Sequence, residues 1–239
     1  MIHFPHRIYI HLRFFIKIPG KNSEFVIAST IHRIYHLFSL FLSIVKVTEI
    51  KKIVIVGPES TGKSTLCEQL AQHYNTNWCP EFAREYLLTN GMNYTYSDLL
   101  KIAKGQLAME DEYIQSTVGS SESGVRNPGS ELRALNSKLL FIDTDMYVMK
   151  VWCEFVFGKC HTWITDQIAK RKYDLYLLCN TDLPWVKDEL REYPDLETRD
   201  KLYHIYKNIL SNQPVPWVDI NGGYEERLQK AILAVNKLL

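Results

Sequence analysis

The turn at residues 57–64 constrains the fold of this chain more than any other stretch. Its sequence is GPESTGKS, it follows the short β-branched run of residues 53–56, and apolar residues at helical spacing come after it. The pattern G-x-x-x-x-G-K-[ST] between an apolar strand and an amphipathic helix is typical of a phosphate-binding loop. The sequence therefore predicts a buried strand, an anion-binding turn and a helix in direct succession.

Each residue type in this turn has a chemical reason. Glycines let the backbone turn tightly and bring successive N–H groups onto phosphate oxygens, while the following helix offers its positive N-terminal end. Lys63 can reach the outer phosphates, and Ser64 can ligate a bridging magnesium ion. The alternative, a glycine-rich turn with an exposed lysine, is disfavoured by the strand and helix around it. We expect the ATP phosphates to be bound by Gly57, Glu59, Ser60, Thr61, Gly62, Lys63, Ser64 and Thr65.

Apolar runs alternate with helical patterns along the rest of the chain. Further strands are predicted at residues 76–79, 139–142, 173–179 and 215–220, with helices at 63–74, 97–117, after residue 145, near 202–209 and at the C-terminal end. This alternation predicts an α/β P-loop NTPase fold with a mostly parallel five-stranded sheet. Helices are expected on both faces, with a helical lid between the last two strands.

Composition and charge limit the possible partners and the domain organisation of the chain. A net charge of +1 offers no footprint for nucleic acid, and five cysteines without CxxC spacing fit a reducing cytoplasm. Residues 1–48 are expected to be a poorly ordered extension, because the apolar run 37–45 is too short to span a membrane; an anchoring helix is the alternative. Residues 49–239 are the predicted P-loop domain, in which the Gly- and Ser-rich residues 119–131 form a flexible loop.

Acidic side chains follow two of the predicted strands. Asp143 ends the run LLFI, where a metal-positioning carboxylate belongs, so Asp143 and Ser64 are the predicted magnesium ligands. Asp145 is either a substrate ligand or the N-cap of the next helix. Glu81, Arg84 and Glu85 follow the second strand and are predicted to bind the substrate, with Glu81 orienting or deprotonating an acceptor hydroxyl. A solvated helix face is the alternative for these three.

Two arginines lie in the predicted lid region. Arg191 follows PWVKDEL, and Arg199 precedes the apolar helical stripe near 202–209, which predicts an inward-pointing side chain. An arginine beside a triphosphate can neutralise the charge that develops during transfer. Lys63, Glu81, Arg191 and Arg199 are therefore the predicted catalytic residues, with surface salt bridges as the alternative for the two arginines.

The segments GPESTGKST, PEFAREYL, FIDTD and PWVKDELR, followed by Arg199, occur in this order. Over residues 50–239 this order resembles the ribosylnicotinamide kinase domain of NadR-type proteins. The resemblance implies a kinase that uses ATP and Mg²⁺ to phosphorylate the ribose 5′-hydroxyl of nicotinamide riboside. It implies that Glu81 holds or deprotonates that hydroxyl and that Asp143 and Ser64 organise magnesium.

Two departures from this family stand out. Bifunctional members of this family carry an upstream adenylyltransferase domain with a histidine motif, which residues 1–48 lack. We therefore expect this chain not to catalyse the second salvage step, which that domain performs. Better-known members place a tryptophan immediately before the glutamate, where this chain has Pro80. Stacking on the base could instead come from Trp78, Phe82 or Tyr147, each of which could equally be a core residue.

Three other functions compete with the nicotinamide riboside kinase. The first is a kinase for another nucleoside or small hydroxyl metabolite. The second is a nucleotide-sensing ATPase that switches a partner protein, although such a protein needs no acceptor carboxylate like Glu81. The third, a membrane-tethered ATPase, depends only on the apolar run 37–45.

Overall fold

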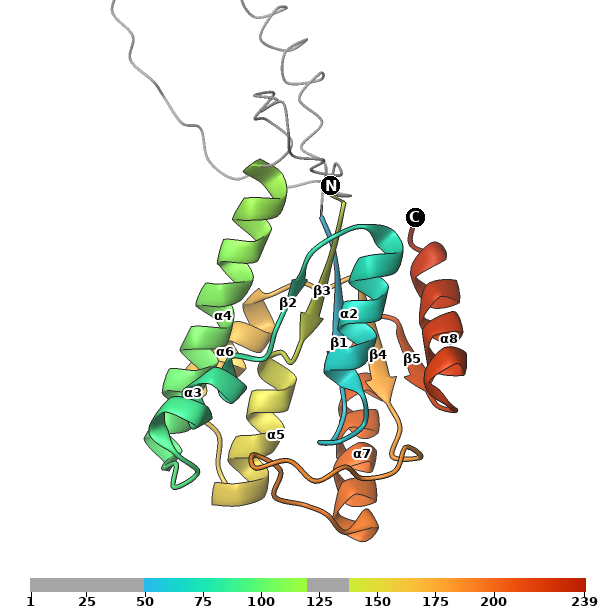
Figure 1. Cartoon of the computed structure of the whole chain (residues 1–239). Coiled ribbons are helices and arrows are strands. Elements are labelled where there is room, and N and C mark those ends of the chain that lie inside the picture. The colour runs from blue at the N-terminus through green and yellow to red at the C-terminus, as the bar shows by residue number, and fades with distance from the viewer. Residues whose placement is uncertain (1–49, 120–137) are drawn as a thin grey trace, which may run out of the picture. The chain divides into compact units, whose positions relative to one another are not determined.

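A five-stranded sheet forms the centre of the computed structural model, which describes residues 50–119 and 138–239 (Figure 1). The strands are β1 (Lys51–Val56), β2 (Trp78–Cys79), β3 (Leu139–Asp143), β4 (Leu175–Cys179) and β5 (Trp217–Ile220). Their order is β2-β3-β1-β4-β5, and all four neighbouring pairs are parallel. The strand that leads into the phosphate-binding turn therefore lies in the middle of the sheet, and the predicted P-loop NTPase fold is confirmed.

Helices cover both faces of this sheet. They are α2 (Lys63–Tyr74), α3 (Phe82–Asn90), α4 (Tyr96–Gly119), α5 (Met146–Phe157), α6 (Thr162–Lys170), α7 (Leu196–Ser211) and α8 (Tyr224–Asn236). The helix α4 begins one residue before the predicted start, where the Asp98 carboxylate accepts a hydrogen bond from the Thr95 N–H at 2.9 Å. An acceptor in the first turn satisfies one of the donors that a helix start leaves open.

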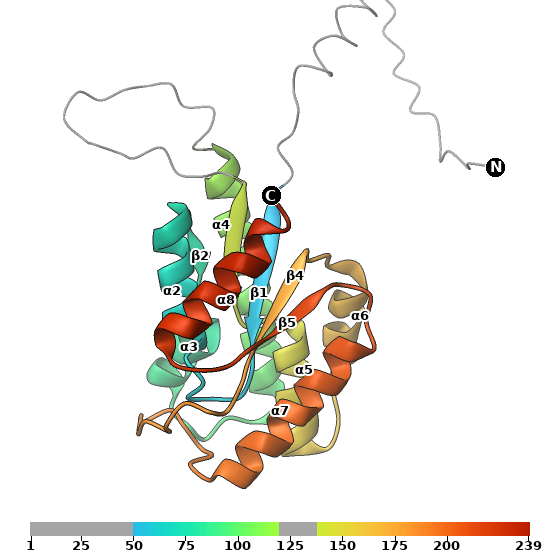
Figure 2. The same ribbon diagram turned by 90° about the vertical axis from the view of Figure 1, so that its right-hand side faces the viewer.

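The alternation of side chains along β1 explains the two layers. Ile53 and Ile55 pack in one core cluster with α2 and α8, whereas Val54 and Val56 pack in a second with α5 and α7. All four side chains are fully buried, as expected for a parallel strand covered on both faces. Figure 2 shows α8 and α7 separated by the edge strand β5. A third cluster joins residues of α3, α4, α5 and α6.

The parallel strands bring their C-terminal ends to one edge of the sheet. Ile55 of β1 pairs with Asp143 of β3, and Val56 pairs with Leu178 of β4. The phosphate-binding turn, the acid at the end of β3 and the segment after β4 must therefore meet at this edge, which is where ligands bind in open α/β sheets. Between β4 and β5, residues 180–195 form an irregular stretch that leads into the helix α7.

Some sequence predictions concern residues without a described structure. The predicted extension 1–48, with its apolar run 37–45, and residues 120–131 of the predicted loop lie outside the described residues. Within residues 50–119 and 138–239, no helix combines the length and apolar character that a membrane crossing needs.

Candidate functional site

The phosphate-binding turn has a backbone that only particular residues can adopt. Gly57 has φ +144°, and a Cβ there would lie 2.7 Å from the Cys179 carbonyl oxygen. Gly62, with φ +79°, immediately precedes α2. Inside the turn, the Thr61 hydroxyl donates to the Pro58 carbonyl oxygen at 2.7 Å. Left-handed backbone at Gly62 and at Ser60 (φ 56°) produces the concave run of N–H groups that binds anions.

Ser64 and Asp143 meet at the floor of the site. The Ser64 hydroxyl, in the first turn of α2, donates to Oδ2 of Asp143, the last residue of β3, at 2.5 Å. Asp143 is fully buried, and its burial raises the pKa of the carboxyl, while Lys63 and the hydroxyls of Ser64 and Thr144 lower it. A hydroxyl and a carboxylate are hard oxygen donors, which suit Mg²⁺ bound mainly by water and phosphate oxygens. Within the described residues no cluster of three His, Cys, Asp or Glu could hold a metal by itself.

Thr144 connects Asp143 to Glu81. Its hydroxyl lies 3.5 Å from both Glu81 Oε1 and Asp143 Oδ1, and Glu81 stands at the N-cap of α3. Thr144 has φ +79°, a strained conformation for a β-branched residue, and such strain concentrates at functional sites. The pKa of Glu81 is raised by burial and by the Asp143 charge, and is lowered by Lys63, Thr144 and Arg84. Sequence reasoning did not select Thr144.

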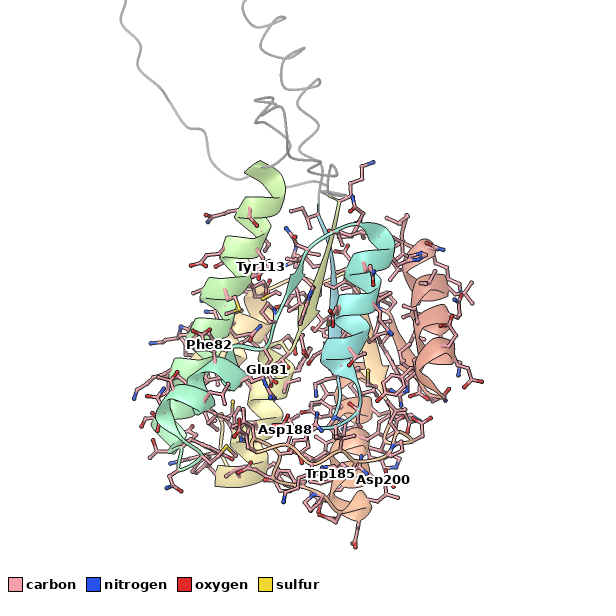
Figure 3. All side chains as sticks on the ribbon, viewed as in Figure 1. Glu81, Phe82, Tyr113, Trp185, Asp188 and Asp200 are labelled. Carbon is pink, nitrogen blue, oxygen red and sulfur yellow. The ribbon has the colours of Figure 1, made fainter. Side chains whose placement is uncertain are left out.

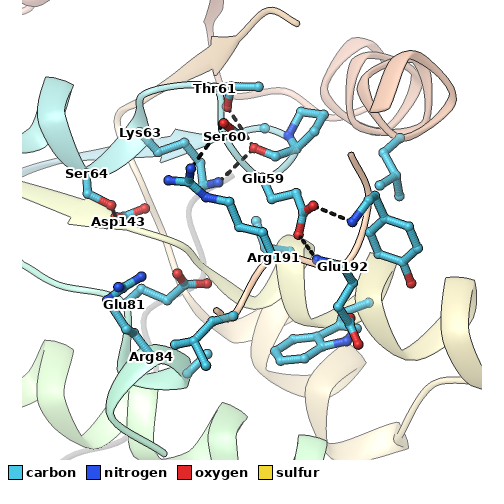
Figure 4. A pocket seen from close by; sticks show the side chains of 18 of the residues that line it. Glu59, Ser60, Thr61, Lys63, Ser64, Glu81, Arg84, Asp143, Arg191 and Glu192 are labelled. Carbon is cyan, nitrogen blue, oxygen red and sulfur yellow. Dashed lines mark hydrogen bonds between the residues drawn. The ribbon is translucent and has the colours of Figure 1, made fainter. Parts of the chain in front are cut away.

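The segment of residues 180–195 is fastened to the phosphate-binding turn. The Glu59 carboxylate accepts hydrogen bonds from the backbone N–H groups of Glu192 at 2.9 Å and Tyr193 at 2.5 Å. The Ser60 hydroxyl accepts from the N–H of Val186 at 2.9 Å. It also accepts from Arg191 Nη1 at 3.2 Å (Figure 4). Both carboxylate oxygens of Glu59 therefore hold this segment, whereas the sequence predicted a phosphate contact for Glu59.

A second attachment comes from α3. Arg84 donates to the two carboxylate oxygens of Asp188 at 3.4 and 3.0 Å. Figure 3 labels Asp188 and Trp185 on this segment and Glu81 at the start of α3. Arg84 also lines the pocket, where a substrate-binding residue was predicted. In this structure its guanidinium pairs with Asp188 of the same chain.

These groups surround one pocket of about 350 Å³. All eight predicted phosphate-binding residues line it, together with Asp143, Glu81, Arg84 and Arg191. Figure 4 shows Ser64, Asp143 and Glu81 along one side, with Arg191 reaching toward the turn from the other. Lys63 Nζ donates to the Pro58 carbonyl oxygen at 2.9 Å.

The prediction that Asp145 binds substrate is not supported by its surroundings. Asp145 Oδ1 accepts from the N–H groups of Tyr147 and Val148 at 2.9 and 3.3 Å, and Oδ2 accepts from the Tyr176 hydroxyl at 2.8 Å. Asp145 is thus the N-cap of α5, which was the alternative interpretation. Asp145 does not line the pocket, and both of its carboxylate oxygens accept hydrogen bonds from other residues of the chain.

Two further predicted residues lie elsewhere. Glu85 is exposed on α3 and absent from the pocket lining. Arg199 is 4% exposed in the first turn of α7 and does not line the pocket either. Its Nε and Nη1 atoms have no hydrogen-bond partner within the described part of the chain.

Aromatic side chains also belong to the pocket lining. Trp152 and Phe155 of α5 line the pocket with Trp78 and Tyr193, and Phe155 meets Tyr193 edge-to-face with centroids 5.5 Å apart. Of the three residues predicted to stack on a base, Trp78 lines the pocket, whereas Phe82 and Tyr147 do not. Trp152 and Phe155 were missed because helical spacing marks them only as part of an apolar face.

Sequence comparison matches the family described as "AAA domain" over residues 52–227. The trifunctional NAD biosynthesis/regulator protein NadR of Salmonella typhimurium is 27% identical over 195 residues, covering 80% of this chain and 43% of that protein. The NadR protein of Escherichia coli K12 is 26% identical with the same coverage. The predicted resemblance to NadR-type proteins is confirmed, and the chain spans less than half the length of these relatives.

Solved structures agree on the fold. NadR in complex with NR has a TM-score of 0.62 and 23% identity, covering 79% of this chain and 49% of that one. Thymidylate kinase from Ehrlichia chaffeensis has a TM-score of 0.52 and 14% identity, covering 78% of this chain and 99% of that one. At these identities the likeness concerns the fold alone, which is that of P-loop nucleotide-binding proteins.

Proposed function

The chain belongs to the family described as "AAA domain", and we propose that it is an ATP-dependent kinase acting on the ribose 5′-hydroxyl of nicotinamide riboside. The product would be nicotinamide mononucleotide. The observation that carries the proposal is the position of Glu81. Its carboxylate lies within reach of the Thr144 hydroxyl that also contacts Asp143, in the pocket lined by the phosphate-binding turn. A nucleotide switch needs no acid there, whereas a kinase needs one to orient or deprotonate the acceptor hydroxyl.

On the donor side, the turn would hold the triphosphate of ATP through its backbone N–H groups, with Lys63 exchanging the Pro58 carbonyl for phosphate oxygens. Ser64 and Asp143 would hold Mg²⁺, which neutralises charge on the transferring phosphoryl group. Arg191, fixed beside the turn by Ser60, would supply a further positive charge there. Arg199 remains a second candidate because two of its buried guanidinium nitrogens have no partner in the described residues.

On the acceptor side, Glu81 would accept the proton of the ribose hydroxyl as its oxygen attacks the γ-phosphorus. A raised pKa brings this carboxylate closer to the pH at which a base is most effective. The aromatic side chains of the pocket lining suit a flat ring, and a solved NadR relative is in complex with NR. We therefore propose that Trp78, Trp152 and Phe155 contact the base, taking over from the tryptophan that Pro80 replaces.

The test is to incubate the protein with magnesium and ATP and a panel of nicotinamide riboside, adenosine, uridine and thymidine. ADP release and product mass are followed, with the Lys63→Met variant as the control for contaminating kinases. We expect nicotinamide riboside to yield nicotinamide mononucleotide and one ADP per product. Equal ADP release with and without any riboside would refute a kinase, and consumption of other nucleosides alone would refute only the substrate.

A further inference from the structure

Arg227 of α8 is a buried cation tied to three separate loops. It is 3% exposed, and its Nε donates to the Gly222 carbonyl oxygen at 2.8 Å. Nη1 donates to the Thr61 carbonyl oxygen at 2.9 Å, and Nη2 donates to the Asn180 carbonyl oxygen at 3.0 Å and to the Asp182 carboxylate. A buried charge is stable only when it is paired and hydrogen-bonded, so this guanidinium holds the three loops in one arrangement.

The contact with Thr61 has a directional consequence for the phosphate-binding turn. The Thr61 carbonyl and the Gly62 N–H belong to one planar trans peptide, so they point in opposite directions. Thr61 and Gly62 line the pocket, whereas Arg227 does not. Because Arg227 holds the carbonyl on the outer side of the turn, the Gly62 N–H is directed toward the pocket, where it can donate to a phosphate oxygen.

The local backbone makes this support necessary. Ser60 and Gly62 both have left-handed φ values, and a glycine can rotate between several backbone states at little cost. The Thr61 hydroxyl is already used inside the turn, on the Pro58 carbonyl oxygen. Among the contacts of the described residues, the Arg227 guanidinium therefore fixes the orientation of the Thr61–Gly62 peptide from outside the turn.

We propose that Arg227 is a positioning residue for the donor nucleotide, which sets the Gly62 N–H for phosphate binding by holding the Thr61 carbonyl. The inference rests on the proposed use of a nucleoside triphosphate and does not depend on the acceptor. Lysine would keep the positive charge, but its single nitrogen cannot bridge three carbonyls in the fixed plane of a guanidinium. The Arg227→Lys substitution therefore keeps the positive charge and removes the hydrogen-bond geometry of the guanidinium.

The experiment measures binding of magnesium ATP and of magnesium tripolyphosphate to the full chain by titration calorimetry. The variants are Arg227→Lys and the matched control Arg171→Lys. Arg171 is also largely buried, pairs with Asp111 at 2.6 and 2.8 Å, and does not line the pocket. We expect Arg227→Lys to weaken both ligands about tenfold or more, in line with a misdirected hydrogen bond to a charged group. Arg171→Lys should stay within about twofold of the wild type, since Arg171 pairs with Glu110 and Asp111 of α4 and does not line the pocket.

Circular dichroism and thermal melting establish that each variant is folded at the temperature of titration. A folded Arg227→Lys protein with wild-type affinity for both ligands overturns the inference, and so does an equal loss in Arg171→Lys. If the wild type itself binds neither ligand, the proposed function fails instead.

A second measurement uses the wild type and does not depend on a variant that folds. In the ¹⁵N-labelled chain, adding magnesium tripolyphosphate should shift the guanidinium resonances of Arg227, because a Gly62 N–H bound to phosphate polarises the Thr61 carbonyl. The Arg171 resonances serve as the internal control and should not move. Unchanged Arg227 resonances at saturation would overturn the inference.

Discussion

Glu81 carries a charge in surroundings that disfavour it. Burial and the neighbouring Asp143 raise the pKa of its carboxyl, and Lys63, Thr144 and Arg84 only partly oppose them. A carboxylate with a raised pKa accepts a proton more readily than an exposed one, which suits a general base for a hydroxyl. The same group is unsuited to holding phosphate, because its negative charge would repel the triphosphate.

Replacement of Glu81 by glutamine tests this role. We expect kcat to fall by about 10²–10⁴-fold, the range typical of a lost general base, with the Kd of magnesium ATP nearly unchanged. The wild-type rate should rise with pH as the Glu81 carboxyl loses its proton, and the variant should lack that rise. Steady-state kinetics and ATP titration measure both effects, with the exposed Glu68→Gln as the control. Equal losses in kcat and in ATP affinity would show that Glu81 acts structurally.

Asp145 presents a different balance between burial and hydrogen bonding. Burial raises the pKa of Asp145 to about 7. The hydrogen bonds from Tyr176, Val148 and Tyr147 lower this pKa, and the negative charge of Glu110 raises it slightly. The folded protein therefore holds the Asp145 proton more tightly than the unfolded chain, whose carboxyl has the ordinary pKa of 3.8. Its contribution to stability is greatest at acidic pH and declines as the pH rises from about 4 to 7.

The Asp145→Asn variant isolates this contribution. We expect the wild-type free energy of unfolding, minus that of the variant, to fall as the pH rises from about 4 to 7, with a slope of at most about 1.4 kcal/mol per pH unit. Urea unfolding of both proteins at several pH values gives the difference directly. A difference that is constant or grows with pH would mean that the hydrogen bonds to Asp145 outweigh its burial.

The stretch between β4 and α7 owes its position to side chains of the phosphate-binding turn. Glu59 holds two of its backbone N–H groups, and Ser60 holds another together with Arg191. An irregular segment without helix or strand bonds of its own depends on such contacts for order. The turn and the segment that carries Arg191 therefore act as one unit.

Loss of the Glu59 carboxylate should detach residues 186–193 from the phosphate-binding turn. For Glu59→Ala we expect amide hydrogen exchange over residues 186–193 to accelerate about tenfold or more, because two N–H groups lose a charged acceptor. Glu59→Gln keeps one acceptor oxygen and should fall between the wild type and the alanine variant. Exchange followed by mass spectrometry measures the change, with β1 peptides as the internal reference. Unaltered exchange in Glu59→Ala would contradict the role given to this carboxylate.

These elements differ in how much of them the sequence could predict. The β1–turn–α2 unit was predictable because its glycines, lysine and apolar runs are adjacent in the chain. The contact between Ser60 and Arg191 joins residues 131 positions apart, so no local pattern encodes it. Trp152 faces the pocket from a helix whose spacing indicates only an apolar face, and Thr144 is marked by a backbone angle that the sequence does not display.

Across the described residues, the site joins loops from most of the sheet. Side chains connect the turn after β1 with Asp143 at the end of β3 and with the segment after β4, and Arg227 adds the loop after β5. A ligand that contacts several of these loops binds the folded state alone and therefore stabilises the whole domain. Thermal unfolding can thus report on the site without any acceptor substrate.

The last prediction uses this coupling to test the magnesium ligands. Magnesium ATP at 100 times its Kd should raise the unfolding temperature by roughly 5–10 °C, corresponding to about 2.7 kcal/mol in a domain of this size. In the wild type the rise should shrink when EDTA removes magnesium. In Asp143→Asn the rise should be the same with and without EDTA, because the buried carboxylate that Ser64 contacts is gone.

The shift, and not the absolute melting temperature, is compared, since removing a buried charge alters the stability of the ligand-free protein as well. A magnesium-dependent shift that survives in Asp143→Asn would assign the metal to other residues, and the absence of any shift in the wild type would contradict nucleotide binding at the turn.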